Sequence, residues 1–475
     1  MSTTSKASQR IAALLDENSF VEIGALVTAR ATDFDLKQTE TPSDGVVTGY
    51  GVINGNLVYV YSQDASVLNG SVGEMHAKKI ANLYDLAMKT GAPVIGLIDS
   101  TGLRLQEATD ALNAFGEIYL KQVNASGVIP QITAILGTCG GGLAIMPTLT
   151  DFTFMEEKNA KLFVNSPNAL EGNNDSKCDT AAAAFQSTET ANVDVVADEA
   201  TIFAKIRELV SLLPANNEDD MSFEECTDDL NRASAELANC VGDTSIALSI
   251  LSDNNVFFEV KESYAKDMVT GFIKLNGVTV GAVANRSEVY ADGEVKEKFD
   301  AALSVRGCEK AADFVNFCDA FGIPVLTLTN VKGYAATVCA EKRIASAVAK
   351  LTYAFANATV PKVNVVIGQA FGSAYVAMNS KAIGADITMA WPDAQIGCMD
   401  AKNAAQIMYE GKGAEVINEK AAEYAALQTS AASAARRGYV DQIVEPADTR
   451  KYVIGAFEML FTKRDERPAK KHGTV

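Results

Sequence analysis

The feature that most constrains this chain of 475 residues is an internal repeat. The segment GAPVIGLIDSTG at 91–102 is echoed by GIPVLTLTNVKG at 322–333, and the segment at 127–147 is echoed by 358–378. The offset is constant, since 324 − 93 and 361 − 130 both give 231 for the paired prolines. Each copy carries an apolar strand that runs into a turn of small residues and then a helix. The repeat therefore predicts two similar half-sites that face one reaction.

Two copies of one unit predict two domains, and the length of the chain agrees. The stretch 214–236 is acidic and lacks apolar periodicity, which indicates a linker or one polar helix. We assign 10–213 to an N-terminal domain, 214–244 to the acidic linker or helix, and 245–475 to a C-terminal domain.

The expected fold class is α/β. Short runs such as PVIGLID and ITAILGT are apolar without polar alternation, as in strands of a largely parallel sheet that is covered on both faces. Stretches with helical periodicity, such as 76–89, lie between these runs. Strands that alternate with helices over short links favour the α/β class.

Composition excludes several classes of function. The net charge of −19 argues against nucleic acid or an anionic membrane as partner. Eight cysteines without a CxxC pair indicate reduced thiols rather than a zinc ribbon or a disulfide framework, and we predict no metal site. The polar N-terminus lacks the apolar core of a signal peptide, so we expect a cytoplasmic protein.

The two turns are the candidate sites of chemistry. Their small residues are Gly140, Gly141 and Gly142 in the first copy, and Gly372, Ser373 and Ala374 in the second. We expect the first strand to end near Thr138 and the helix to begin near Leu143. Backbone N–H groups left unpaired at such a turn stabilise an anion, and two turns suit two oxyanions. Close packing alone is the alternative, whereas GTCGGG lacks the GxGxxG spacing of a dinucleotide site.

Several long stretches together resemble one family, the carboxyltransferase (β) subunit of biotin-dependent acyl-CoA carboxylases. They are DGVVTGYGVINGNLVYVYSQD at 44–64, the segments at 73–102 and 126–142, ADFVNFCDAFGIP at 312–324, and the span 358–397. The chain most resembles the propionyl-CoA carboxylase β and methylmalonyl-CoA decarboxylase α types.

The resemblance implies two crotonase/Clp-like domains of ββα superhelix type, related by duplication. It also implies a hexamer whose active sites form between domains of different subunits. Acyl-CoA would bind the N-terminal domain, and carboxybiotin would enter from the C-terminal side. Biotin would be covalently attached to a separate carrier protein, with biotin carboxylase or membrane decarboxylase subunits as further partners. The chain would then act in the cytoplasm or at the cytoplasmic face of a membrane complex.

The resemblance also implies roles for single residues. Gly141 and Gly142 would hold the enolate oxygen of the thioester, and Ser373 and Ala374 the ureido oxygen of biotin. The residues expected on the CoA side are Arg104, Gly102, Lys78, Lys79 and Gly140. Arg104 is the best candidate for a phosphate contact. The alternative for each of the three cations is a solvated surface charge without a ligand. The expected biotin side comprises Gly372, Gly333, Tyr334 and Val376, and Val376 occupies a family position that lines the acyl pocket.

The match with the family breaks in two places. The segment after AKLFVNSP is shorter than in the family, and NVKGYAATV at 330–338 replaces a DVPGFLPG loop. Four hypotheses follow: an active carboxyltransferase, the same subunit working in a sodium-coupled methylmalonyl-CoA decarboxylase, a structural paralogue without turnover, and a Clp-like peptidase that pairs Ser373 with His76.

Overall fold

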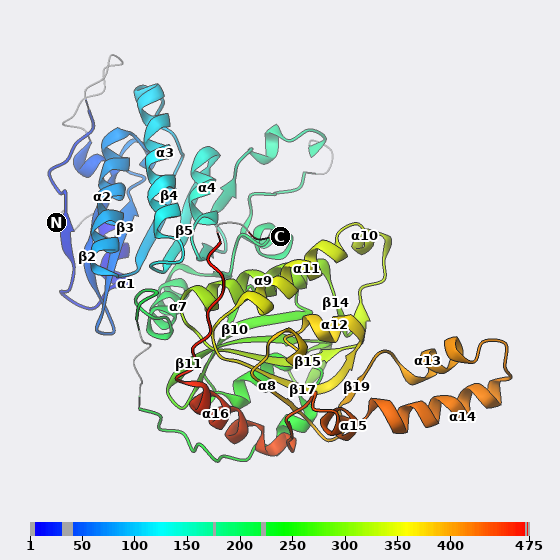
Figure 1. The fold of residues 1–475 in the computed structure, drawn as a ribbon. Helices are drawn as coiled ribbons and strands as arrows, with labels where there is room; N and C mark the ends of the chain where they lie inside the picture. The colour runs from blue at the N-terminus through cyan, green and yellow to red at the C-terminus, as the bar shows by residue number, and fades with distance from the viewer. Residues whose placement is uncertain (1–4, 31–40, 174–176, 220–224, 471–472, 474–475) are drawn as a thin grey trace. The chain divides into compact units, whose positions relative to one another are not determined.

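The computed structural model describes residues 5–30, 41–173, 177–219, 225–470 and 473. The chain divides into two compact units, Met1–Asp220 and Met221–Val475, and each unit has its own sheet and core (Figure 1). The predicted linker bounds, and the assignment of one substrate to each half, stay predictions.

The first unit is built on a mixed sheet with the strand order β1-β2-β3-β4-β5-β6-β8, in which β7 also pairs with β5. Its strands are β1 (Val21–Ile23), β2 (Val46–Ile53), β3 (Asn56–Gln63), β4 (Val94–Ser100), β5 (Gln131–Gly140), β6 (Phe152–Glu156), β7 (Lys161–Phe163) and β8 (Val195–Ala197). The pairs β1·β2 and β2·β3 are antiparallel, and the pairs from β3·β4 onward are parallel. The apolar runs recognised in the sequence are the parallel strands, which are buried on both faces.

Helices of the first unit cover this sheet. They are α1 (Lys6–Leu14), α2 (Glu74–Thr90), α3 (Ala108–Ala125), α4 (Ile145–Thr148), α6 (Ala183–Thr188) and α7 (Glu199–Leu212). Helix α2 places Ile80, Leu83 and Tyr84 in the core, as the spacing of its apolar residues predicts. It ends at Thr90 and is capped by Gly91, which takes the left-handed conformation that closes many helices.

The second unit repeats this plan with the order β20-β18-β17-β15-β11-β10-β9, and β19 pairs with β17. Its main strands are β9 (Phe257–Val260), β10 (Met268–Leu275), β11 (Val278–Asn285), β15 (Val325–Val331), β17 (Lys362–Phe371), β18 (Ile387–Ala390), β19 (Gln395–Gly397) and β20 (Gln442–Ile443). Two small sheets join β12 (Glu288–Ala291) to β13 (Glu294–Lys298) and β14 (Ala302–Leu303) to β16 (Gly333–Tyr334). The α/β class predicted from the sequence is confirmed in both units.

The helices of the second unit are α8 (Thr244–Leu251), α9 (Val305–Ala320), α10 (Val338–Glu341), α11 (Ile344–Asn357), α12 (Gly372–Ala377), α13 (Ala401–Met408), α14 (Ala414–Tyr424), α15 (Ala431–Arg436) and α16 (Thr449–Leu460). Helices α13 and α14 pack on each other and project from the rest of the unit as a hairpin (Figure 1). Within the described ranges, none of the helices combines the length and the hydropathy that a bilayer crossing needs.

The duplication extends to the register of the strands. Val94 pairs with Gln131 between β4 and β5, and Val325 pairs with Lys362 between β15 and β17, so both partners are displaced by 231 (325 − 94, 362 − 131). The same irregularity interrupts both ladders, between Ile98 and Ser100 and between Thr329 and Val331. The two units therefore present strand ends in equivalent register.

Candidate active site at two strand-to-helix turns

The first turn joins β5 to a short 3-10 helix, η5 (Gly141–Ala144). The strand runs to Gly140, two residues beyond the predicted end at Thr138, because β7 pairs with its last three residues. Gly141 has a φ of 64°, a left-handed conformation that favours glycine, and a Cβ there would meet no atom within 4 Å. Gly142 follows and is exposed. The turn therefore presents its backbone to solvent.

The second turn joins β17 to α12 and repeats this geometry. Gly372 has the same φ of 64°, and 372 − 141 again gives 231. The exposed residue of the turn is Ser373 in place of Gly142, and the following Ala374 is buried. The register thus matches Gly141 and Gly142 with Gly372 and Ser373, one residue earlier than the pair expected from the sequence.

The first N–H groups of a helix have no partner within the helix, and they point along its axis toward whatever lies in front. Both turns therefore offer backbone donors at an open strand end. An apolar residue stands beside each: Ile145 is 40% exposed and Val376 is 36% exposed, and 376 − 145 is 231. Two exposed apolar side chains at equivalent places suit a ligand that is partly apolar at each turn.

A tyrosine hydroxyl contacts each turn. Tyr119 of α3 donates its hydroxyl hydrogen to the backbone oxygen of Gly142. Tyr334 of β16 donates to the hydroxyl oxygen of Ser373, at 2.6 Å between the two oxygens. Sequence reasoning found Tyr334 through the family motif, but it missed Tyr119, which lies on a helix distant in sequence and has no counterpart in a motif.

The strand before each turn is braced by a polar side chain at equivalent positions, Asp99 and Asn330 (330 − 99 = 231). A Cβ at Gly137 would lie 2.0 Å from Asp99 Oδ1, and one at Gly368 would lie 2.6 Å from Asn330 Oδ1, so both strands need glycine there. Asp99 forms an ion pair with Arg10 at 2.9 Å. Asn330 Oδ1 instead accepts a hydrogen bond from a backbone N–H on the neighbouring strand β17. The brace is therefore charged in the first unit and neutral in the second.

Gly102 and Gly333 occupy equivalent places after the preceding strands (333 − 102 = 231). Gly102 has a φ of 103°, and a Cβ there would lie 2.9 Å from the backbone oxygen of Gly140. Gly102 therefore lets the chain pass close to the first turn. Gly333 has a φ of 157° and pairs with Ala302, and a Cβ there would meet no atom within 4 Å. The second turn is thus more open on this side.

Arg104 is not available to a phosphate in this structure, which corrects the role predicted for it. Its guanidinium is fully buried and donates to Asp44 Oδ1 at 2.5 Å, Glu107 Oε1 at 2.8 Å and the backbone oxygen of Ser71 at 2.7 Å. Two buried carboxylates therefore surround its charge. Arg104 holds the chain segments beside the first turn together.

His76 lies in the same buried cluster. Its backbone N–H donates to Asp44 Oδ2 at 2.7 Å, and its ring Nδ1 lies 2.9 Å from the backbone oxygen of Asp44. Burial, together with the nearby charge of Arg104, holds the pKa of His76 well below its usual value. A fully buried, neutral imidazole cannot serve as the base of a solvent-accessible peptidase site, and Ser373 bonds to Tyr334 instead. The geometry therefore gives the peptidase hypothesis no support.

The two lysines predicted to contact CoA lie in different environments, since Lys79 is buried and Lys78 is exposed. Lys79 is buried and donates to the backbone oxygens of Ser43 and Val46, and burial lowers its pKa to about 8. Its counterpart Lys310 (310 − 79 = 231) likewise donates to two backbone oxygens. Both therefore tie down loops, which again corrects the phosphate role predicted for Lys79. Lys78 is exposed and pairs with Glu74 at 2.7 Å, so it keeps its charge at the surface.

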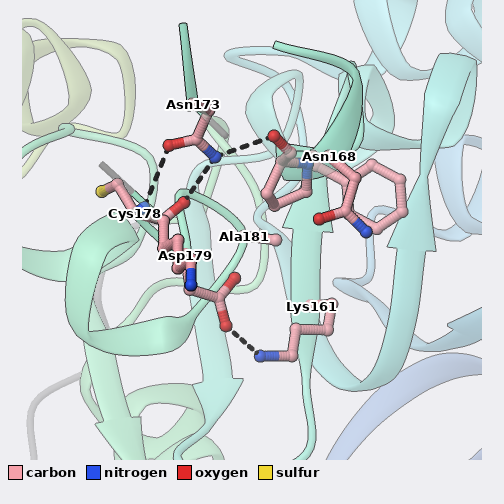
Figure 2. A pocket seen from close by; sticks show the side chains of 9 residues that line it. Lys161, Asn168, Asn173, Cys178, Asp179 and Ala181 are labelled. Carbon is pink, nitrogen blue, oxygen red and sulfur yellow. Dashed lines mark hydrogen bonds and ion pairs between the residues drawn. The ribbon is translucent and has the colours of Figure 1, made fainter. Parts of the chain in front are cut away.

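A cavity of about 600 Å³ lies beside the first turn. Its lining residues are Lys161, Phe163, Pro167, Asn168, Asn173, Lys177, Cys178, Asp179 and Ala181. Figure 2 shows the ion pair between Lys161 and Asp179, at 2.7 Å, and the Asn173 side chain bonded to two backbone oxygens. The Phe163 ring stands against Gly140, where a Cβ would come within 2.8 Å of it. The segment in which this chain departs from the family pattern thus builds a recess of mixed polar and apolar lining next to the first turn.

Comparison with known proteins agrees with this arrangement. Residues 4–475 match the family model of the carboxyl transferase domain. The chain is 39% identical to the methylmalonyl-CoA decarboxylase subunit alpha of Propionigenium modestum, over 99% of this chain and 92% of that protein. It is 40% identical to the propionyl-CoA carboxylase beta chain of Roseobacter denitrificans, over 99% and 93% of the two chains.

Comparison with solved structures agrees with the family match. A crystal structure of transcarboxylase 12S, a hexamer with methylmalonyl-coenzyme A and methylmalonic acid bound, superposes with a TM-score of 0.91 at 37% identity. The superposition covers 98% of this chain and 92% of that one. The predicted resemblance and the predicted duplicated fold are both confirmed.

Proposed function

The chain belongs to the carboxyl transferase family, and we propose that its two turns share one carboxyl transfer. It is a biotin-dependent acyl-CoA carboxyltransferase of the propionyl-CoA carboxylase and transcarboxylase type. The proposed reaction moves a carboxyl group between carboxybiotin on a separate carrier protein and an acyl-CoA of the propionyl-CoA or acetyl-CoA class. The observation that supports one role for each turn is the duplication of the turn itself, with Gly141 and Gly372 in the same left-handed conformation.

The first turn is proposed to hold the thioester oxygen. When the carboxyl group joins or leaves the α-carbon, negative charge develops on this oxygen, as in any enolate. The backbone N–H groups of Gly141 and Gly142 are preorganised donors for it, because the strand end and the short helix fix their direction. The exposed Ile145 provides an apolar wall for the acyl chain.

The second turn is proposed to hold the ureido oxygen of biotin, which supplies or accepts the activated carboxyl group. The residues present fit such a group, since Gly372 leaves the backbone open and the nearest atom to a Cβ there is a backbone oxygen at 3.3 Å. The proposed donors are the backbone N–H groups of Ser373 and Ala374, a pair that begins one residue further along the turn than the register equivalents of Gly141 and Gly142. The exposed Val376 would contact the apolar part of the bound substrates.

The phosphates of CoA need a cation at the surface. Of the three cations predicted from the sequence, Arg104 and Lys79 are buried, so Lys78 of α2 remains as the proposed contact. Gly102 and Gly140 shape the backbone around the first turn, and Gly333 does so at the second.

The two relatives carry names for opposite reactions, a carboxylase and a decarboxylase, and carboxyl transfer is the step that both share. We propose that the chain assembles as a hexamer and works with a biotin carrier protein. The further partner is a biotin carboxylase in the carboxylating direction, or membrane subunits of a sodium-coupled decarboxylase in the other. The proposed location is the cytoplasm or the cytoplasmic face of such a complex.

An assay of the isolated protein tests this function. Purified protein incubated with malonyl-CoA or methylmalonyl-CoA should release CO2 when free biotin or a biotinylated carrier is added, and much less without either. An absence of both turnover and acyl-CoA binding would contradict the proposal and leave a structural paralogue as the remaining hypothesis.

A further inference from the structure

We propose that the hydroxyl groups of Tyr334 and Ser373 act as one hydrogen-bond donor to the anion held at the second turn. This inference rests on the function proposed above for that turn. Neither hydroxyl has a counterpart in the pattern it is compared with. Tyr334 stands where the DVPGFLPG loop has phenylalanine, and Ser373 stands where the first copy of this chain has Gly142. One departure from the family loop and one difference between the two copies of this chain thus meet in a single hydrogen bond.

The geometry gives the two hydroxyls different tasks. The residues lie 39 positions apart, on β16 and on α12, and their oxygens are 2.6 Å from each other. Tyr334 donates, so the hydroxyl hydrogen of Ser373 remains free to donate to a third group. Both residues are exposed at the end of the second sheet, with Tyr334 at 37%. Donation from one hydroxyl polarises the next and strengthens its own donation.

The first turn shows what the same contact does without a serine. Tyr119 donates to the backbone oxygen of Gly142, a group that has no hydrogen to pass on. Tyr119 therefore only braces the main chain. At the second turn the phenol meets a side-chain hydroxyl, and the turn gains a donor that the first turn lacks. Ser373 is accordingly the catalytic residue of the pair, and Tyr334 is the positioning residue.

Four variants and one control test this inference. They are Tyr334→Phe, Ser373→Ala, the double variant, the hydroxyl-retaining Ser373→Thr, and Tyr452→Phe as a tyrosine of similar exposure on α16. The readouts are kcat for CO2 release with free biotin, KM for methylmalonyl-CoA and the melting temperature. A hydrogen bond to a charged group is worth about tenfold in rate, so kcat should fall about tenfold in Ser373→Ala and less in Tyr334→Phe.

The pattern of effects separates a chemical role from a structural one. KM for methylmalonyl-CoA should stay unchanged, Ser373→Thr should retain most activity, and the double variant should be no worse than Ser373→Ala, because Tyr334 acts through the serine. A wild-type kcat in both single variants, or losses of kcat that multiply in the double variant, would overturn this inference and leave the proposed function standing. A wild-type protein without CO2 release would overturn the proposed function and this inference with it.

Discussion

The two turns share a backbone and differ in the side chains around it. Gly141 and Gly372 have the same φ, and the strands before them pair in the same register. Around the first turn the bracing groups are charged, with the partly buried Asp99 paired to the buried Arg10, and Arg104 enclosed by buried carboxylates. Around the second turn the brace is the neutral Asn330, and the added groups are exposed hydroxyls.

Under the proposed function, this difference would allow two copies of one unit to perform two tasks. The backbone donors are kept, since both halves of a carboxyl transfer place negative charge on an oxygen. Under the proposed function the side chains would diverge because a CoA thioester and a biotin ring differ in shape and polarity. Each of the following changes acts on one copy and has a matched position in the other.

The largest expected effect is on the stability of the first unit. Replacing Arg104 by Met leaves Asp44 and Glu107 as buried carboxylates without their cation, which costs about 3–5 kcal/mol. Denaturant unfolding should show this loss in Arg104→Met. The matched change Ala335→Met in the second unit (335 − 104 = 231) should have little effect. Equal losses of unfolding free energy in Arg104→Met and Ala335→Met would contradict the proposed difference between the two units.

Proline at the exposed residue of each turn tests the backbone donors. Gly142→Pro and Ser373→Pro each remove one N–H, and the loss of such a donor lowers kcat by about 10²–10³. Gly142→Ala keeps the N–H, and its Cβ would lie 3.3 Å from the Tyr119 hydroxyl, so it serves as the control for the first turn. CO2 release that survives either proline would remove that turn from the mechanism.

Alanine at the left-handed glycines tests the backbone that the turns share. Gly141→Ala and Gly372→Ala force a side chain into a φ of 64°, which costs about 1–2 kcal/mol. The cost should be larger at Gly372, because the new Cβ would lie 3.3 Å from the backbone oxygen of Cys398, whereas no atom lies near it at Gly141. Thermal melting of the two variants would measure the difference, and a larger loss at Gly141 would contradict it.

The smallest effect concerns acid stability. The folded-state pKa of His76 lies below its unfolded value, so unfolding takes up a proton as the pH falls. The stability that the neutral ring contributes is present above about pH 6.5 and is lost below it, at up to about 1.4 kcal/mol per pH unit. His76→Gln should flatten the unfolding free energy between pH 6.5 and 5.5. The second unit has Gly307 at the equivalent position (307 − 76 = 231) and therefore lacks this titrating group. An unchanged pH dependence of unfolding in His76→Gln would exclude His76 as the origin of the acid sensitivity.

Much of the fold could be predicted because the repeat is visible in short stretches of sequence, such as 91–102 and 322–333. The offset of 231 between paired prolines also relates the paired residues of β4·β5 to those of β15·β17. The turns themselves were visible as clusters of small residues after apolar runs. The end of β5 was predicted two residues early, because its last pairs are made with β7, a short strand that carries no strong signal of its own.

The side-chain environment of the site was less predictable, since it depends on contacts that are distant in sequence. Arg104 follows a strand end in a family-like motif, which suggested a ligand contact. Its partner Asp44 lies 60 residues earlier, and only the folded chain shows that the two charges are buried together. Tyr119 likewise reaches Gly142 across 23 residues from a helix without a motif.

The proposed function assigns the acyl-CoA to the first turn and biotin to the second. Its most direct test is the calorimetric affinity for methylmalonyl-CoA in the wild type, Gly142→Pro and Ser373→Pro. We predict that Gly142→Pro weakens binding severalfold and that Ser373→Pro binds as the wild type does. Equal weakening in both variants, or weakening in Ser373→Pro alone, would contradict the account.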